Sequence, residues 1–266
     1  ASQVQKEKPV ETSVGVNCWR ESRAIEKVGL YIPGGTAPLF STILMSVIPA
    51  KIAGCERMVL CTPPDKSGSV NAEILWTVQF LGVDEVYKVG GAQAIFAMTY
   101  GTEQIPRVDK IFGPGNQFVT AAKILASQRV AIDMPAGPSE VLVIADKDSN
   151  PAFVASDLLS QAEHGMDSQA VLVCTHEKKV EDVLAEVEKQ LAVLPRKEMA
   201  EKSLESSYAV IAKNMEEAVE FSNIYAPEHL ILSMDNWKDL IPKIKNAGSV
   251  FCGPYSAESF GDYASG

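Results

Sequence analysis

One predicted helix carries side chains that can ligate a metal. Asn150 can cap the start of this helix, and Gly165 follows its end. Gln161 and His164 are three residues apart and share a face, with Asp157 one turn earlier. A metal would need further ligands from elsewhere, because one helix face does not complete a site. Alternatively, His164 only interacts with the dipole at the helix C-terminus.

A carboxylate and an imidazole are adjacent at Glu228 and His229, where an apolar strand is predicted to begin. A Glu and a His in one cleft are the usual groups for proton transfer near neutral pH. Neighbouring residues of an extended strand point to opposite faces, so the two need not act as one dyad. A solvated Glu beside a buried His is the alternative interpretation.

Asp262 lies beside a glycine in a turn close to the end of the chain. A loop carboxylate of this kind can ligate a metal. It can also hydrogen-bond to its own backbone as an ordinary turn residue, which is the commoner case.

Ligands of open α/β sheets bind at the carboxyl ends of strands, where loops and helix N-termini present free N–H groups. Four loops rich in glycine and proline are expected at such ends, at residues 32–35, 90–93, 113–116 and 135–139. Gln93 and Asn116, close to predicted helix starts, add neutral hydrogen-bonding groups. The dinucleotide fingerprint is incomplete, since Phe118 stands where its third glycine would be. Ordinary turns explain each loop equally well.

The elements that position these residues alternate between short β-branched strands and helices from residue 28 onward. This alternation predicts parallel strands joined by crossover helices. A Pro/Gly-rich crossing at residues 133–140 separates two such series. We therefore predict an α/β fold with two Rossmann-like domains, at residues 31–138 and 139–266, each a parallel sheet flanked by helices. Residues 1–30 are expected to form an N-terminal segment that packs with the second domain.

Composition restricts the classes of function. The 266 residues include 24 Lys and Arg against 34 Asp and Glu, a net charge of −10 that disfavours nucleic-acid binding. No apolar run reaches the roughly 20 residues that span a bilayer, and no secretory signal is evident at the N-terminus. The five cysteines are scattered, which argues against a disulfide framework. We expect a soluble, cytoplasmic protein that binds neither nucleic acid nor membrane.

Taken together, the ordered set of these segments resembles the histidinol dehydrogenase family. The resemblance extends from about residue 10 to residue 266 and rests on GLYIPGG (29–35), VGGAQAI (89–95), IFGPGN (111–116), DMPAGPSE (133–140), LSQAEHG (159–165), PEHL (227–230) and GDY (261–263). It implies a homodimeric, zinc-dependent enzyme of histidine biosynthesis. The reaction it implies is the oxidation of L-histidinol to L-histidine through L-histidinal, in two hydride transfers to NAD.

The resemblance also implies roles for individual residues. The residues that would contact NAD are Tyr31, Gln93 and Asn116. The zinc ligands would be Gln161, His164 and Asp262, although helix spacing alone favours Glu163 over the uncommon glutamine ligand. The residues that would hold the substrate are Ser139, Gln161, His164, His229 and Asp262.

Two of these residues would carry the proton transfers. The resemblance implies that His229 takes the hydroxyl proton as hydride leaves and that Glu228 activates the water that attacks the aldehyde. Zinc would orient and polarise the bound substrate.

The sequence departs from the family pattern at Gly266, where the family continues into a domain with another zinc-ligating His and a substrate-contacting Glu. We therefore expect this chain alone to bind zinc weakly and to turn over poorly. Two other functions are compatible with the residues. One is a metal-free NAD oxidoreductase with His229 as base, and the other is a non-catalytic ligand-binding protein.

Overall fold

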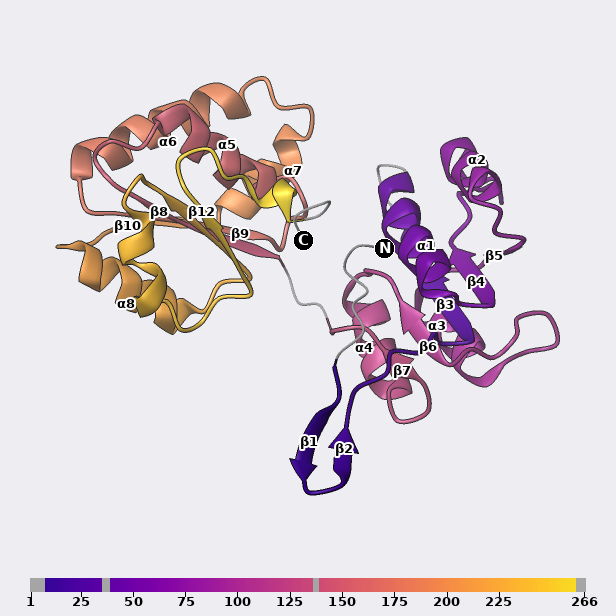
Figure 1. Cartoon of the computed structure of the whole chain (residues 1–266). Helices are drawn as coiled ribbons and strands as arrows, with labels where there is room; N and C mark the ends of the chain where they lie inside the picture. Colours follow the sequence, from indigo (N-terminus) through magenta and orange to yellow (C-terminus); the bar gives the residue numbers. More distant parts are fainter. Residues whose placement is uncertain (1–7, 35–38, 136–138, 262–266) are drawn as a thin grey trace. The chain divides into compact units, whose positions relative to one another are not determined.

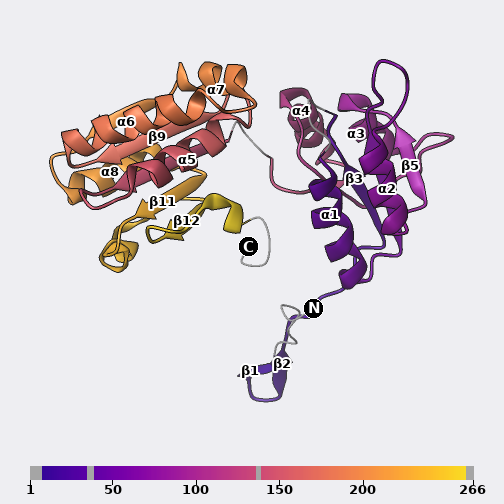
Figure 2. The same cartoon turned by 90° about the horizontal axis from the view of Figure 1, so that it is seen from above.

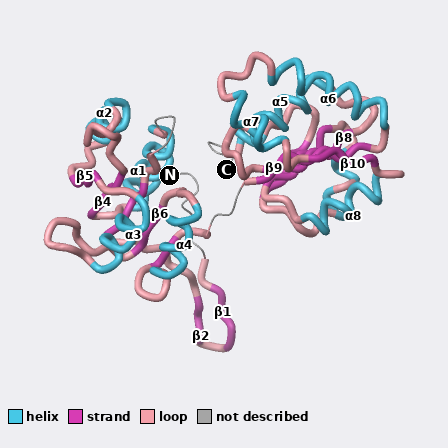
Figure 3. Tube along the Cα trace, turned by 180° about the vertical axis from the view of Figure 1, so that it is seen from behind, coloured by secondary structure: helices cyan, strands magenta, loops and turns pink. Residues whose placement is uncertain are grey.

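The computed structural model describes residues 8–34, 39–135 and 139–261, and the chain folds as two compact units, Ala1–Gly137 and Pro138–Gly266 (Figure 1). Strands and helices alternate within each unit, as Figure 3 shows. No helix among these residues is long and apolar enough to cross a membrane.

The first unit contains a five-stranded parallel sheet in the order β5-β4-β3-β6-β7. Its strands are β3 (Lys27–Tyr31), β4 (Arg57–Thr62), β5 (Glu85–Lys88), β6 (Lys110–Phe112) and β7 (Ala131–Ile132). Apolar residues of α1 (Phe40–Ala53) and α2 (Ala72–Phe80) pack on one face, and those of α3 (Gly91–Tyr100) and α4 (Gln117–Ala126) pack on the other (Figure 2). The expected domain start at residue 31 falls within this sheet, because β3 already begins at Lys27.

Strand order in the first sheet reverses beside its central strand. The chain passes from β3 to β4 and β5 on one side, and returns to β6 and β7 on the other. The carboxyl ends of β3 and β6 therefore form the topological switch point, where ligands of such sheets bind.

The second unit repeats this arrangement in the order β10-β9-β8-β11-β12. Its strands are β8 (Glu140–Ala145), β9 (Gln169–Cys174), β10 (Tyr208–Ile211), β11 (His229–Ser233) and β12 (Ser249–Cys252). Apolar residues of α5 (Pro151–Ala162) and α6 (Glu177–Leu191) pack on one face with Leu204 of α7 (Lys197–Leu204), while α8 (Met215–Tyr225) packs on the other. Three short 3₁₀ turns follow β11: η1 (Trp237–Asp239), η2 (Ile241–Lys243) and η3 (Glu258–Phe260). Two helix-flanked parallel sheets confirm the predicted α/β fold.

An antiparallel hairpin of β1 (Val10–Ser13) and β2 (Val16–Cys18) precedes the first sheet. All seven strand residues are exposed. The alternation of buried and exposed residues that marks a strand is therefore missing, and the sequence analysis did not predict this hairpin.

Candidate functional site

Tyr31 ends the central strand of the first sheet and is buried. Its hydroxyl accepts a hydrogen bond of 3.0 Å from the backbone N–H of Gly91, the first residue of α3. The ring packs in the apolar cluster that includes Ala94 and Ile95. The Tyr31 side chain thus holds the N-terminus of α3 against the end of β3.

Gly113, just after β6, approaches the same strand end more closely than any other residue type would allow. Its φ is +126°, and a Cβ built on it would lie 2.0 Å from the carbonyl oxygen of Tyr31. Its N–H donates to Oδ2 of Asp133 at 2.8 Å, and its carbonyl accepts from Nζ of Lys123 at 2.9 Å. Lys123 is buried and forms an ion pair with Asp133. The Lys123–Asp133 ion pair therefore fixes both the N–H and the carbonyl of Gly113.

Asn116 and Gln93 lie at the starts of α4 and α3, the two helices that pack on the same face of the first sheet. Asn116 caps α4, because its Oδ1 accepts from the N–H groups of Phe118 and Val119 at 3.1 and 3.2 Å. The cap occupies the oxygen and leaves the exposed amide nitrogen as a donor. Gln93 is the third residue of α3 and is exposed. The structure thus places both amides at helix N-termini, where anions bind favourably.

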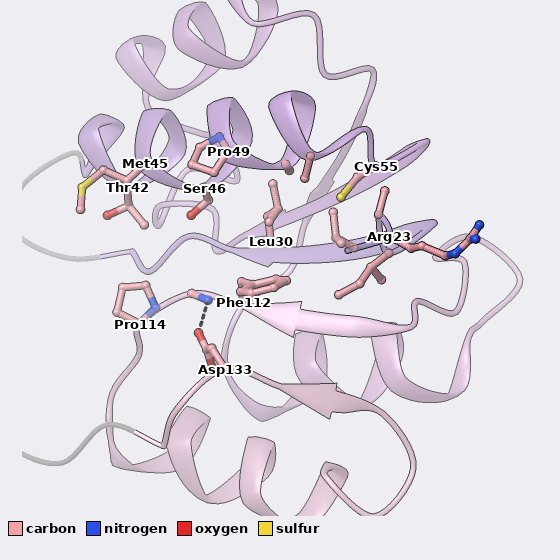
Figure 4. Close-up of a pocket in the computed structure, with 16 residues that line it drawn as sticks. Arg23, Leu30, Thr42, Met45, Ser46, Pro49, Cys55, Phe112, Pro114 and Asp133 are labelled. Atoms are coloured by element: carbon pink, nitrogen blue, oxygen red, sulfur yellow. Dashed lines mark hydrogen bonds between the residues drawn. The ribbon is translucent and has the colours of Figure 1, made fainter. Parts of the chain in front are cut away.

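A cavity of about 560 Å³ lies on the other face of the sheet, between α1 and the strands β3 and β6 (Figure 4). Leu30, Met45 and Phe112 give it a mostly apolar lining, and Asp133 lies at its edge. Of the described residues that line it, none is an expected NAD contact. For Tyr31 the reason is strand alternation, since Leu30 and Tyr31 point to opposite faces.

Residues expected to bind substrate in the second unit lie at the amino ends of its strands. Ser139 precedes β8 directly, and His229 is the first residue of β11, which pairs with β8 in parallel with His229 opposite Val141. The N–H of Glu228 donates to Oε2 of Glu140 at 3.0 Å. Ser139, Glu228 and His229 are therefore neighbours at one sheet edge. It is the edge opposite to the one where such sheets usually bind ligands.

The last turn of α5 lies near the amino ends of these strands, because the helix runs antiparallel to β8 and β9, which it connects. Gln161 is 1% exposed, and neither its Oε1 nor its Nε2 has a hydrogen-bond partner among the described residues. His164 is exposed, and its Nδ1 lies 2.7 Å from the carbonyl oxygen of Ser160. The carbonyl fixes the proton on Nδ1, so Nε2 carries the lone pair available to a ligand.

Glu258 is a residue that the sequence analysis did not select. Its Oε2 lies 3.6 Å from Nδ1 of His229, and the two side chains are 12% and 26% exposed. It begins η3, in the segment that follows β12. No local pattern in the sequence marks it, because its contact with His229 depends on the path of the chain after β12.

Asp157 lies in a protein environment that disfavours its ionised form. Burial, together with the negative charge of Glu258, raises the pKa of Asp157 from 3.8 to about 7. In the unfolded chain the Asp157 carboxyl keeps its ordinary pKa and therefore releases its proton at lower pH. Asp157 therefore lowers stability progressively as the pH rises from about 4 to about 7.

Asp157→Asn is expected to stabilise the second unit, and more so at pH 8 than at pH 5, because the amide has no charged form to desolvate. Urea denaturation at the two pH values measures this difference. Asp235→Asn, at an exposed position of the same unit, is the control. An equal effect of Asp157→Asn at both pH values would contradict the assignment.

The expected metal site is described only in part. Asp262 lies outside the described residues, so the structure does not place it. Within the ranges 8–34, 39–135 and 139–261, no three His, Cys, Asp or Glu side chains gather as a metal site. Of the two expected ligands that are described, Gln161 lies in the last turn of α5, whereas His164 follows two residues after the helix ends at Ala162. The helix is therefore shorter than the expected one, which included both residues.

Comparison with known proteins decides the family. The histidinol dehydrogenase family profile matches residues 1–266. The chain belongs to the histidinol dehydrogenase family. The resemblance seen in the sequence is thereby confirmed.

Curated histidinol dehydrogenases are longer than this chain. The one from Bacteroides fragilis is 64% identical over 260 residues, which cover 97% of this chain and 61% of the relative. The one from Haemophilus influenzae is 58% identical over 266 residues, covering 100% of this chain and 61% of the relative. The chain thus spans about 61% of the length of these relatives.

One solved structure of this family matches the chain closely, and a second solved structure shares its fold. The crystal structure of histidinol dehydrogenase from Elizabethkingia anophelis matches with a TM-score of 0.94 and 58% identity, covering 100% of this chain and 61% of that chain. An acetylating aldehyde dehydrogenase from Geobacillus thermoglucosidasius has a TM-score of 0.64 at 15% identity, covering 99% of this chain and 72% of that chain. At such low identity the second likeness shows the fold alone.

Proposed function

We propose that this histidinol dehydrogenase chain takes part in oxidising L-histidinol to L-histidine through L-histidinal, with two hydride transfers to NAD, as the last step of histidine biosynthesis. Family membership supports the reaction class. The observation that carries the proposal to this chain is the Gln161 carboxamide, which is buried with both polar atoms unpartnered among the described residues. A buried amide left in this way costs stability unless a ligand satisfies it.

The described donors at the amino edge of the second sheet fit a zinc ion. Oε1 of Gln161 and Nε2 of His164 would hold the ion together with Asp262. The backbone carbonyl on Nδ1 of His164 is the usual outer partner of a ligating histidine. When bound, zinc would supply Lewis acidity that orients and polarises the substrate.

The helix N-termini of the first unit fit a dinucleotide. Tyr31, Gln93 and Asn116 would contact NAD, with the exposed amides of the latter two donating to its polar groups. NAD supplies the hydride acceptor. Tyr31 would act by holding the start of α3 in place as well as by contact, because its hydroxyl already accepts from Gly91.

The proton transfers would be carried by His229 and Glu228. His229 would receive the substrate hydroxyl proton on Nε2 as hydride departs. Glu228 is exposed at the same edge and would take a proton from the water that attacks the aldehyde. Ser139, next to them, would hydrogen-bond the substrate. We further propose that the working enzyme is a homodimer.

The deciding experiment measures NADH formation from L-histidinol by the chain extended to the full length of its relatives, before and after removal of metal by a chelator. We expect activity to fall on chelation and to return with added zinc. Activity that is unaffected by chelation would favour a metal-free oxidoreductase. Absence of histidinol-dependent NADH from a folded, zinc-loaded sample would reject the proposed reaction.

A further inference from the structure

We infer that Glu258 is a positioning residue for His229: its carboxylate faces Nδ1 of the imidazole and keeps the proton there, which leaves Nε2 free as the base. This inference rests on the proposed function for its catalytic meaning. The contact itself is a property of the fold, with 3.6 Å between Nδ1 and Oε2.

Burial places this contact where water screens it little. The two facing atoms, Nδ1 of His229 and Oε2 of Glu258, are both shielded from solvent. Charge interactions in such surroundings are screened far less than in water. The separation is slightly longer than a hydrogen bond, and catalytic hydrogen bonds commonly tighten only when substrate is bound.

Both partners are held in place by backbone structure. His229 is paired on both sides, with Val141 of β8 and with Ser249 of β12. Glu258 begins a 3₁₀ turn that is closed by a hydrogen bond of 2.9 Å from the N–H of Gly261 to its carbonyl. The side chains therefore meet because two rigid elements bring them together.

Phe251 links the two elements. Its ring centroid lies 6.0 Å from that of His229, at an angle of 57°. A Cβ built on Gly261 would lie 3.0 Å from the same phenylalanine ring, so η3 packs against it. The ring thus restricts the imidazole from one side while the turn presents Glu258 to it.

This arrangement matches what a general base requires. A carboxylate on Nδ1 fixes the tautomer with the lone pair on Nε2, and it stabilises the imidazolium that forms when Nε2 takes the substrate proton. Glu228 is exposed and lies one residue before β11, whereas Glu258 has the carboxylate oxygen that faces Nδ1 of His229.

The first test determines the tautomer of His229 by ¹⁵N NMR in this 266-residue chain. The chain has three histidines, so replacing His164 and His176 singly assigns the signals. We expect neutral His229 to carry its proton on Nδ1, and Glu258→Leu to shift the population towards Nε2–H. A parent His229 protonated mainly on Nε2 would overturn the inference, whatever the enzyme's reaction.

The second test measures steady-state kinetics of Glu258→Gln in the chain extended to full length. The amide keeps the shape and removes the charge, so we expect kcat to fall by about 100-fold or more with KM for NAD within about twofold. Glu220→Gln, exposed in the same unit, should leave kcat unchanged. Parental kcat in Glu258→Gln would refute the positioning role. A parent without histidinol-dependent NADH would instead reject the proposed function and leave the tautomer measurement decisive.

Discussion

His229→Asn in the full-length enzyme is expected to lower kcat for histidinol oxidation by about 10²–10⁴-fold, the usual contribution of a general base. Asparagine still offers a side-chain N–H towards Glu258, so the local packing is preserved. It has no group that takes a proton near neutral pH. The loss should therefore appear in kcat, with little change in the free energy of unfolding.

Glu228→Gln is expected to affect the other half of the reaction. A glutamine does not deprotonate water, so oxidation of the aldehyde should slow while oxidation of the alcohol continues. Parent enzyme should form two NADH per histidinol, and this variant should approach one. Stopped-flow measurement of NADH, with L-histidinal supplied directly in a second series, separates the two steps. Equal slowing of both oxidations in Glu228→Gln would show that the two residues do not divide the work as proposed.

Much of the fold could be predicted because buried parallel strands and amphipathic helices have strong patterns. The alternation predicted from residue 28 onward is present in both units, with strands such as Lys110–Phe112 and helices such as Met215–Tyr225. The elements that were missed carry weak patterns. Strand β7 has two residues, half of the residues of β12 are exposed, and half of those of α7 are charged.

The site was harder to predict than the elements, since it depends on which strand ends meet. Sequence reasoning placed Asn116 correctly at a helix start, but it placed Gln161 and His164 on one helix although α5 ends at Ala162. Sequence reasoning favoured the carboxyl ends of strands for ligands, whereas Ser139 and His229 lie at amino ends. Glu258 reaches His229 only because the chain reverses after β12, which no local pattern encodes.

Lys123→Met is expected to destabilise the first unit by about 3 kcal/mol or more, because it leaves Asp133 beside the backbone of Gly113 without its countercharge. Urea denaturation measures the loss in free energy of unfolding. Hydrogen–deuterium exchange in peptides from this unit serves as the signal that monitors unfolding. Lys66→Met, at an exposed position of the same unit, should change stability by no more than about 0.5 kcal/mol.

The double variant Lys123→Met/Asp133→Asn separates stability from positioning. Removing both charges should restore much of the stability lost in Lys123→Met, since no buried charge is then left unpaired. The carbonyl of Gly113 nevertheless loses its buried cationic donor, so the loop that leads to Asn116 becomes less fixed. We therefore expect the full-length double variant to be nearly as stable as the parent and to have a higher KM for NAD. If KM for NAD instead follows stability in both Lys123→Met and the double variant, the ion pair serves folding alone. If KM stays raised in the stable double variant, Lys123 and Asp133 orient the loop that leads to Asn116, through the N–H and the carbonyl of Gly113.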